Sequence, residues 1–202
     1  MNSLRKISLT FGILLILGSH TLTAGGISDP QKTVADFHDS LTQVLKEKSY
    51  ESKLSLLLRS VPKLFAVETI ARISVGRTAW ALLNENEKQS FRMLTKDLIA
   101  STYAARFREY RNQRFKIVES KSLPKNRQAV KTQLFSGEAV VSLEYHLQKK
   151  DSVWQIYDIV ANGVSDLSLK RAAYGKTLSE SGFNGLVDDI SEEIKKNAQK
   201  SL

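Results

Sequence analysis

The residue types of a hydrolase triad occur side by side once in the chain, at His38, Asp39 and Ser40. Neighbouring residues of a helix point about 100° apart, so these three side chains cannot form a relay from nucleophile to base to orienting acid. His146 alternates with apolar residues in a strand-like segment, which is typical of a solvated surface histidine. The sequence contains no phosphate-binding loop, dinucleotide-binding glycine motif, Gly-x-Ser-x-Gly elbow or His-Glu-x-x-His motif. We therefore expect a protein that is not an enzyme, with no catalytic residue, no metal site and no cofactor.

Basic residues are concentrated in one part of the chain. The whole sequence has 30 Lys and Arg residues against 21 Asp and Glu residues, a formal charge of +9. The segment 106–131 alone has a net charge of +7, and we call its basic residues the basic cluster: Arg106, Arg108, Arg111, Arg114, Lys116, Lys121, Lys125, Arg127 and Lys131. This cluster could dock on an anionic surface, or it could be a solvated surface that only aids solubility.

The elements that position these residues follow from the hydrophobic periodicity. Apolar residues at three- and four-residue spacing predict helices in the N-terminal half and again near the C-terminus. Between them the period changes to two, which predicts strands that pair as an antiparallel meander. The predicted helices span residues 31–48, 54–59, 62–65, 67–80 with a break at Gly76, 84–111, and two stretches after Gly163 separated at Gly182; the predicted strands span 114–120, 127–135, 138–148 and 152–161.

Helices that precede and follow a sheet, instead of alternating with its strands, favour an α+β fold. We expect a curved antiparallel sheet of four to five strands covered by six or seven helices. This arrangement can leave an apolar ligand cavity between the helices and the sheet. On the long helix, Tyr103, Phe107 and Tyr110 form an aromatic stripe that is either ordinary core or the wall of a pocket mouth.

The first 24 residues have the composition of a cleavable signal peptide. Arg5 and Lys6 precede an apolar stretch, residues 7–17, that is too short to span a bilayer, and a cleavage position follows at Ala24. The sequence contains no cysteine, which excludes disulfides, thiolate metal sites and a cysteine nucleophile. We expect an exported chain whose residues 25–202 fold as a single domain. For an exported protein, the basic cluster indicates anionic lipid or an acidic partner and not nucleic acid.

Several ordered sequence blocks resemble the periplasmic lipid carriers of the Mla system, the MlaC or toluene-tolerance auxiliary family. Near the C-terminus these blocks are WQIYDIVANGVS at residues 154–165, YGKTL at 174–178 and GFNGL at 182–186. Upstream, the block IARISVGR at residues 70–77 is similar to part of the family's central helical region. The resemblance extends over roughly residues 30–195.

The resemblance implies a periplasmic carrier that shuttles phospholipid between a membrane-bound transporter and an outer-membrane complex, and so maintains the lipid asymmetry of the outer membrane. We expect a monomer that contacts membranes transiently. The residues expected to bind the ligand are Tyr103, Phe107, Tyr110, Val141, Leu143, Tyr145, Val164 and Leu167. The residues expected to bind the head group or dock a partner are Arg106, Arg108, Arg111 and Arg114, because guanidinium groups pair bidentately with phosphate.

Some positions depart from the pattern of the phospholipid carriers. Asn162 and Asn184 stand where an acidic residue is usual, and Asp166 stands where an apolar residue is common and could alter the cavity mouth. The segments 103–107 and 165–167, together with Arg171, instead resemble the hopanoid-associated branch of the family, which leaves a polycyclic triterpenoid as an alternative cargo. A third interpretation is an interaction module that binds an acidic envelope component and has a filled core.

Overall fold

The computed structural model describes residues 29–110 and 112–199, and within them six helices precede and follow five strands. The expected signal peptide at residues 1–24 lies outside the described residues, as does Arg111. The helices are α1 (Pro30–Lys46), α2 (Tyr50–Leu64), α3 (Val67–Val75), α4 (Arg77–Leu82), α5 (Glu85–Arg106) and α6 (Asp166–Gln199). The strands are β1 (Arg114–Leu123), β2 (Arg127–Ser136), β3 (Ala139–Lys150), β4 (Val153–Ala161) and β5 (Val164–Ser165).

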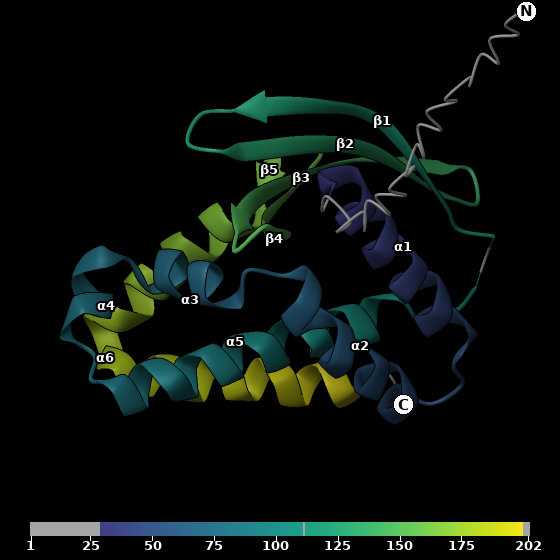
Figure 1. Cartoon of the computed structure of the whole chain (residues 1–202). Helices are drawn as coiled ribbons and strands as arrows, with labels where there is room; N and C mark the ends of the chain where they lie inside the picture. The colour runs from purple at the N-terminus through teal and green to yellow at the C-terminus, as the bar shows by residue number, and fades with distance from the viewer. Residues whose placement is uncertain (1–28, 111, 200–202) are drawn as a thin grey trace, which may run out of the picture.

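The five strands form the predicted antiparallel meander, in the order β1-β2-β3-β4-β5. The register shifts between Ile117 and Glu119 on β1 and between His146 and Leu147 on β3, and such bulges increase the twist of a sheet. The helices lie together on one side of the sheet, where α5 and α6 run side by side and α1 crosses close beneath the strands (Figure 1). The α+β fold with an open antiparallel sheet is therefore as predicted.

The sheet and the N-terminal helices share one apolar core. The faces of β2 and β3 that carry Val130, Tyr145 and Leu147 pack against the buried side of α1, including Phe37 and Leu41. Backbone contacts reinforce this packing, because the N–H of Ala66 donates to the carbonyl of Ile156 at 2.8 Å. A second buried cluster, around Phe91, joins α3 and α5 to α6.

Helix α2 corrects one prediction, because the two short helices expected at 54–59 and 62–65 are one continuous helix. Ser49 caps its start by accepting from the N–H of Ser52. Pro62 lies in the last turn, where its missing N–H removes a single bond near the end of the helix. Leu57 and Val61, which precede Pro62 along the helix, are fully buried, and their packing holds the helix together.

Helix α5 corrects a second prediction, because it ends at Arg106 and not at residue 111. Its start has the predicted capping box between Asn84 and Glu87. At its other end the buried Lys53 of α2 donates from Nζ to the carbonyl oxygens of Phe107 and Arg108. These bonds satisfy carbonyl groups where the helix ends, and burial lowers the pKa of Lys53.

Gly76 separates α3 from α4, as the sequence predicts, and its backbone has a φ of +92° that favours glycine. Arg171 of α6 crosses directly over this glycine, and its Nη1 donates to the carbonyl of Val75 at 3.1 Å. A Cβ atom at residue 76 would lie 2.2 Å from Nη2 of Arg171. The absence of a side chain at residue 76 therefore lets α6 bind the end of α3.

We predict that Gly76→Ala lowers the free energy of unfolding by about 3 kcal/mol. Alanine is strained at this positive φ, and its methyl group would displace the Arg171 guanidinium from its charge-assisted hydrogen bond to Val75. Gly163→Ala is the matched control. Gly163 has a φ of +84°, but a Cβ atom at this position would have no neighbouring atom within 4 Å. The free energy of unfolding of Gly163→Ala should therefore fall by only about 1 kcal/mol. Urea unfolding of both variants measures the difference, and equal losses would refute a role for the Arg171 contact.

Candidate functional site: an apolar cavity between sheet and helices

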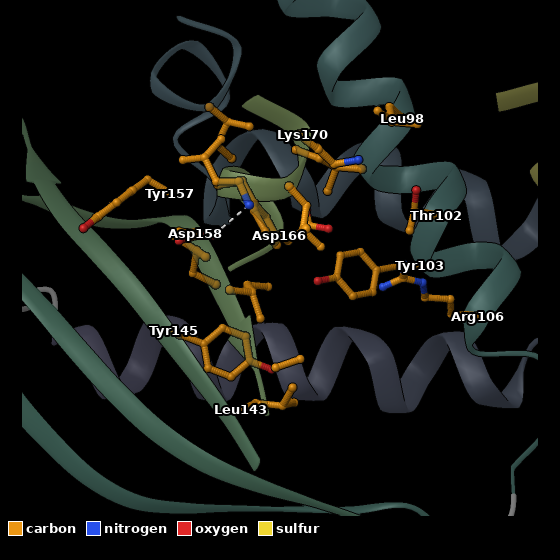
Figure 2. A pocket seen from close by; sticks show the side chains of 18 of the residues that line it. Leu98, Thr102, Tyr103, Arg106, Leu143, Tyr145, Tyr157, Asp158, Asp166 and Lys170 are labelled. Atoms are coloured by element: carbon orange, nitrogen blue, oxygen red, sulfur yellow. Dashed lines mark hydrogen bonds between the residues drawn. The ribbon is translucent and has the colours of Figure 1, made fainter. Parts of the chain in front are cut away.

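A cavity of about 540 Å³ lies between the inner face of the sheet and helices α5 and α6. This volume is in the range of small-molecule binding sites, about 300–1,000 Å³. Most of its wall is apolar, with residues from the sheet on one side and from α5 and the start of α6 on the other (Figure 2). The core that the sequence pattern predicts is therefore not completely filled.

The structure brings most of the predicted ligand-binding residues to this cavity. Those that line it are Tyr103, Phe107, Val141, Leu143, Tyr145, Val164 and Leu167. They come from α5 and the residue that follows it, and from β3, β5 and α6. The three on β3 lie together because alternate residues of a strand share one face. Arg106 also lines the cavity, whereas the other described arginines of the docking set, Arg108 and Arg114, do not.

Tyr110 is the exception among the predicted ligand-binding residues. The stripe of Tyr103 and Phe107 does not continue to it, because α5 ends at Arg106 and Phe107 takes a non-helical conformation. Tyr110 is 54% exposed and is not part of the cavity wall. The structure therefore does not bring Tyr110 together with the other seven residues.

The cavity opens to solvent beside β5 and the first turns of α6. Val164 and Leu169 belong to its wall and yet are 52% and 59% exposed. Arg106 and Asp166, which are exposed as well, lie at the same opening. We call these four residues, together with Lys170 and Glu193, the mouth of the cavity.

The mouth has its shape because Asp158 of β4 holds the beginning of α6. Its carboxylate accepts from the hydroxyl of Ser165 at 2.7 Å and from the N–H of Leu167 at 3.0 Å. The Ser165 hydroxyl in turn accepts from the N–H of Ser168, as an N-cap residue does. His146 is half-buried beside this arrangement, with Nε2 2.7 Å from Oε1 of Glu144, and is not the solvated histidine that its strand position predicts.

A buried histidine packs against two residues of the cavity wall, Phe115 and Tyr145. His38 of α1 is 5% exposed, its ring stacks on Phe115 at 4.0 Å, and its Nε2 lies 3.1 Å from the hydroxyl of Tyr145. Burial lowers the pKa of His38 to about 4. Ser40 donates to the carbonyl of Asp36 in its own helix, so the three residues at 38–40 do not form a triad.

The basic cluster is divided between two places in the fold. Arg106 lies at the mouth, whereas Lys116, Lys121 and Lys131 lie on β1 and β2, on the face of the sheet that points away from the helices. Phe115 and Ile117 point toward α1, so Lys116 between them points outward. Beyond the bulge of β1, the buried Val130 faces the core, so its neighbours Ala129 and Lys131 face outward, and Lys121 lies on that same face because it pairs with Ala129. The outer face of the β1–β2 hairpin is therefore basic, and Arg111 lies outside the described residues.

Sequence reasoning missed several residues of the cavity wall. Leu134 lies directly opposite Val141 in the register of β2 and β3, and that pairing could have identified it. Tyr174 follows Leu167 at helical spacing along α6 and also lines the cavity. Lys170 and Glu193 had no local signal, because only the packing of α6 against α5 brings them to the mouth.

In residues 29–110 and 112–199, no group of His, Asp and Glu side chains is arranged to hold a metal ion. In the same residues, no helix combines the length and apolarity needed to cross a membrane.

Comparison with known proteins completes the description of the site. The model of a protein family described as "MlaC protein" matches residues 31–192, whereas no curated protein matches the sequence. Among solved structures, the phospholipid-binding protein from Ralstonia solanacearum, in complex with a phospholipid, has a TM-score of 0.75. It is 21% identical to this chain, and the alignment covers 85% of this chain and 99% of that one. At this identity, the structural similarity shows a common fold.

Proposed function

The chain belongs to the MlaC family, and from this premise we propose that it is a phospholipid carrier of the periplasm. In this proposal the acyl chains occupy the cavity, and the protein shuttles lipid between a membrane-bound transporter and an outer-membrane complex. This transfer helps to maintain the lipid asymmetry of the outer membrane. The protein acts as a monomer, after removal of its signal peptide, and catalyses no covalent step.

The observation that carries this proposal is the cavity, whose wall is apolar and whose mouth is charged. Each methylene group that leaves an apolar environment costs ~0.8 kcal/mol in water, so a lipid with about 30 methylenes faces a barrier on the order of 20 kcal/mol. An apolar cavity removes most of that barrier without any chemical reaction. The phospholipid in the R. solanacearum structure supports the same class of cargo.

The experiment that tests this function is native mass spectrometry of the purified chain, followed by organic extraction and lipid analysis. We expect a mass increment of one or more phospholipids and their recovery in the extract. A triterpenoid in the extract would instead support the hopanoid-associated branch. A folded chain that contains no lipid and takes up none from vesicles would contradict the carrier function and favour an interaction module.

We further propose that the outer face of the β1–β2 hairpin docks the carrier on anionic membranes or on an acidic partner. Lys116 and Lys121 are exposed there and, within the part of the chain that the structure describes, neither makes an ion pair. Arg127, at the start of β2, is more constrained, because its guanidinium carbon lies 4.8 Å from the centroid of the Tyr157 ring. The two exposed lysines are therefore the residues that a partner or a membrane can engage.

We predict that the double variant Lys116→Gln, Lys121→Gln binds anionic vesicles roughly 30-fold more weakly at low salt, since each lysine near such a surface contributes about 1 kcal/mol. Vesicle co-sedimentation at low and high ionic strength measures this loss. A double variant of Lys195 and Lys196 to Gln, on α6, is the control for net charge. Binding that is independent of salt, or equally weakened in both variants, would argue against this face.

A further inference from the structure

The mouth of the cavity carries charges of both signs. Arg106 comes from the last turn of α5, Asp166 and Lys170 from the first turns of α6, and Glu193 from the later part of α6. The mouth thus has two cations and two carboxylates. This balance contrasts with the +9 charge of the whole chain and with the basic outer face of the hairpin.

These four charged groups do not neutralise one another by contact. Within residues 29–110 and 112–199, none of the four side chains makes an ion pair or a hydrogen bond in the structure. Other charged side chains of α6 do pair locally, as Lys196 does with Glu192 at 3.8 Å. The groups at the mouth are therefore free to interact with a ligand.

Two tyrosine side chains show that the charges converge on the cavity. Tyr103 points toward Asp166, with Arg106 beside it (Figure 2). Burial raises the pKa of Tyr103, the charge of Asp166 raises it further, and that of Arg106 opposes the rise. Burial also raises the pKa of Tyr174, with contributions from Glu193 and Asp166. Asp166 therefore acts on both hydroxyls, which stay protonated and can donate hydrogen bonds at the boundary between apolar wall and charged mouth.

The cavity also continues into a polar groove between α5 and α6. Thr102, Arg106 and Glu193 line both spaces. A ligand with an apolar body in the cavity can thus place a polar end between a guanidinium and a carboxylate. The groove offers further charges of both signs from Arg108 and Asp189.

We propose that the mouth selects a zwitterionic head group that bears a primary ammonium beside its phosphate, with Arg106 and Lys170 on the phosphate and Asp166 and Glu193 on the ammonium. This inference rests on the proposed carrier function and adds its head-group preference. A purely anionic head group, such as phosphoglycerol, meets the same cations but leaves two carboxylates facing a negative ligand without compensation. Specificity then comes from repulsion as much as from attraction.

The experiment offers the lipid-free chain equimolar phosphatidylethanolamine and phosphatidylglycerol with identical acyl chains in mixed vesicles. The protein is then separated from the vesicles, and its lipid is extracted and quantified. We expect the wild type to enrich phosphatidylethanolamine over phosphatidylglycerol by roughly three- to tenfold. This is the preference that one hydrogen bond between the ammonium and a carboxylate gives at a partly exposed site. Asp166→Asn should bring the ratio of the two lipids close to that of the vesicles, and the Asp166→Asn, Glu193→Gln double variant should favour phosphatidylglycerol.

Asp188→Asn is the matched control. Asp188 lies on α6 and is exposed, but it does not line the cavity or the polar groove, so the same change of charge should leave the lipid ratio unchanged. A wild-type ratio equal to that of the vesicles, or an Asp166→Asn ratio equal to the wild type, would overturn the proposal. Total lipid per protein reports separately on the carrier function, because a chain that selects no head group can still be fully loaded.

Discussion

A Val141→Trp chain should keep its fold and lose most of its bound lipid. Val141 lines the cavity from the inner face of β3 and is half-buried, so a larger side chain extends into the space between the sheet and α5. An indole there displaces about three methylenes of an acyl chain, which at ~0.8 kcal/mol each weakens binding by roughly 2 kcal/mol, a factor of about 30. Lipid content by native mass spectrometry and the unfolding midpoint are measured on the same sample.

The adjacent residue supplies the control for this substitution. Val140 lies on the same strand, points to the opposite face and is 53% exposed. Val140→Trp therefore adds the same side chain outside the cavity and should retain the wild-type lipid content. If Val141→Trp keeps its lipid while remaining folded, the acyl chains do not lie against the inner face of β3.

Acidification should destabilise the fold through His38. Burial lowers its pKa to about 4 in the folded chain, from the ordinary histidine value of 6.5. Between these two pH values the unfolded chain binds a proton that the folded chain excludes, so stability falls as the pH is lowered through this window. The full shift corresponds to on the order of 3 kcal/mol, a large part of the stability of an ordinary domain.

A variant without the titratable imidazole of residue 38 isolates the part of the pH-dependent stability that comes from His38. His38→Gln keeps a polar group near the Tyr145 hydroxyl but binds no proton, so its free energy of unfolding should depend less on pH between 6.5 and 4. It should also be less stable than the wild type at pH 7, because the stacking on Phe115 is lost. Urea unfolding across this pH range measures both effects, and parallel curves for the two chains would assign the acid sensitivity to other groups.

The sequence predicted those parts of the fold that depend on local pattern. The change of period near residue 114 located the meander, Asn84 and Glu87 located the start of α5, and Gly76 located the break after α3. Each of these signals lies within a few residues of its effect. The inner face of β3 follows from the same kind of pattern, because the alternate residues Val141, Leu143 and Tyr145 share one face of the strand, and all three line the cavity.

The sequence did not predict features that depend on contacts between residues far apart in the chain. The end of α5 depends on Lys53, which is 54 residues away from Phe107 in the sequence, and no periodicity near Tyr110 carries that information. The charged mouth likewise depends on how α6 packs against α5. Asp166 drew notice only as a departure from a family pattern, and Glu193 lay in an acidic run typical of a solvated helix face.

The contacts of α1 with strands β3 and β4 can form only after most of the chain has been synthesised. The hydroxyl of Thr33 donates to the carbonyl of Trp154, 121 residues further along, and His38 meets Tyr145 after 107 residues. A chain that emerges N-terminus first, from a ribosome or a translocation pore, therefore presents the apolar side of α1 long before β3 and β4 can cover it. During that interval a holdase chaperone has a surface to bind, and refolding of the denatured chain must await the closure of these long loops.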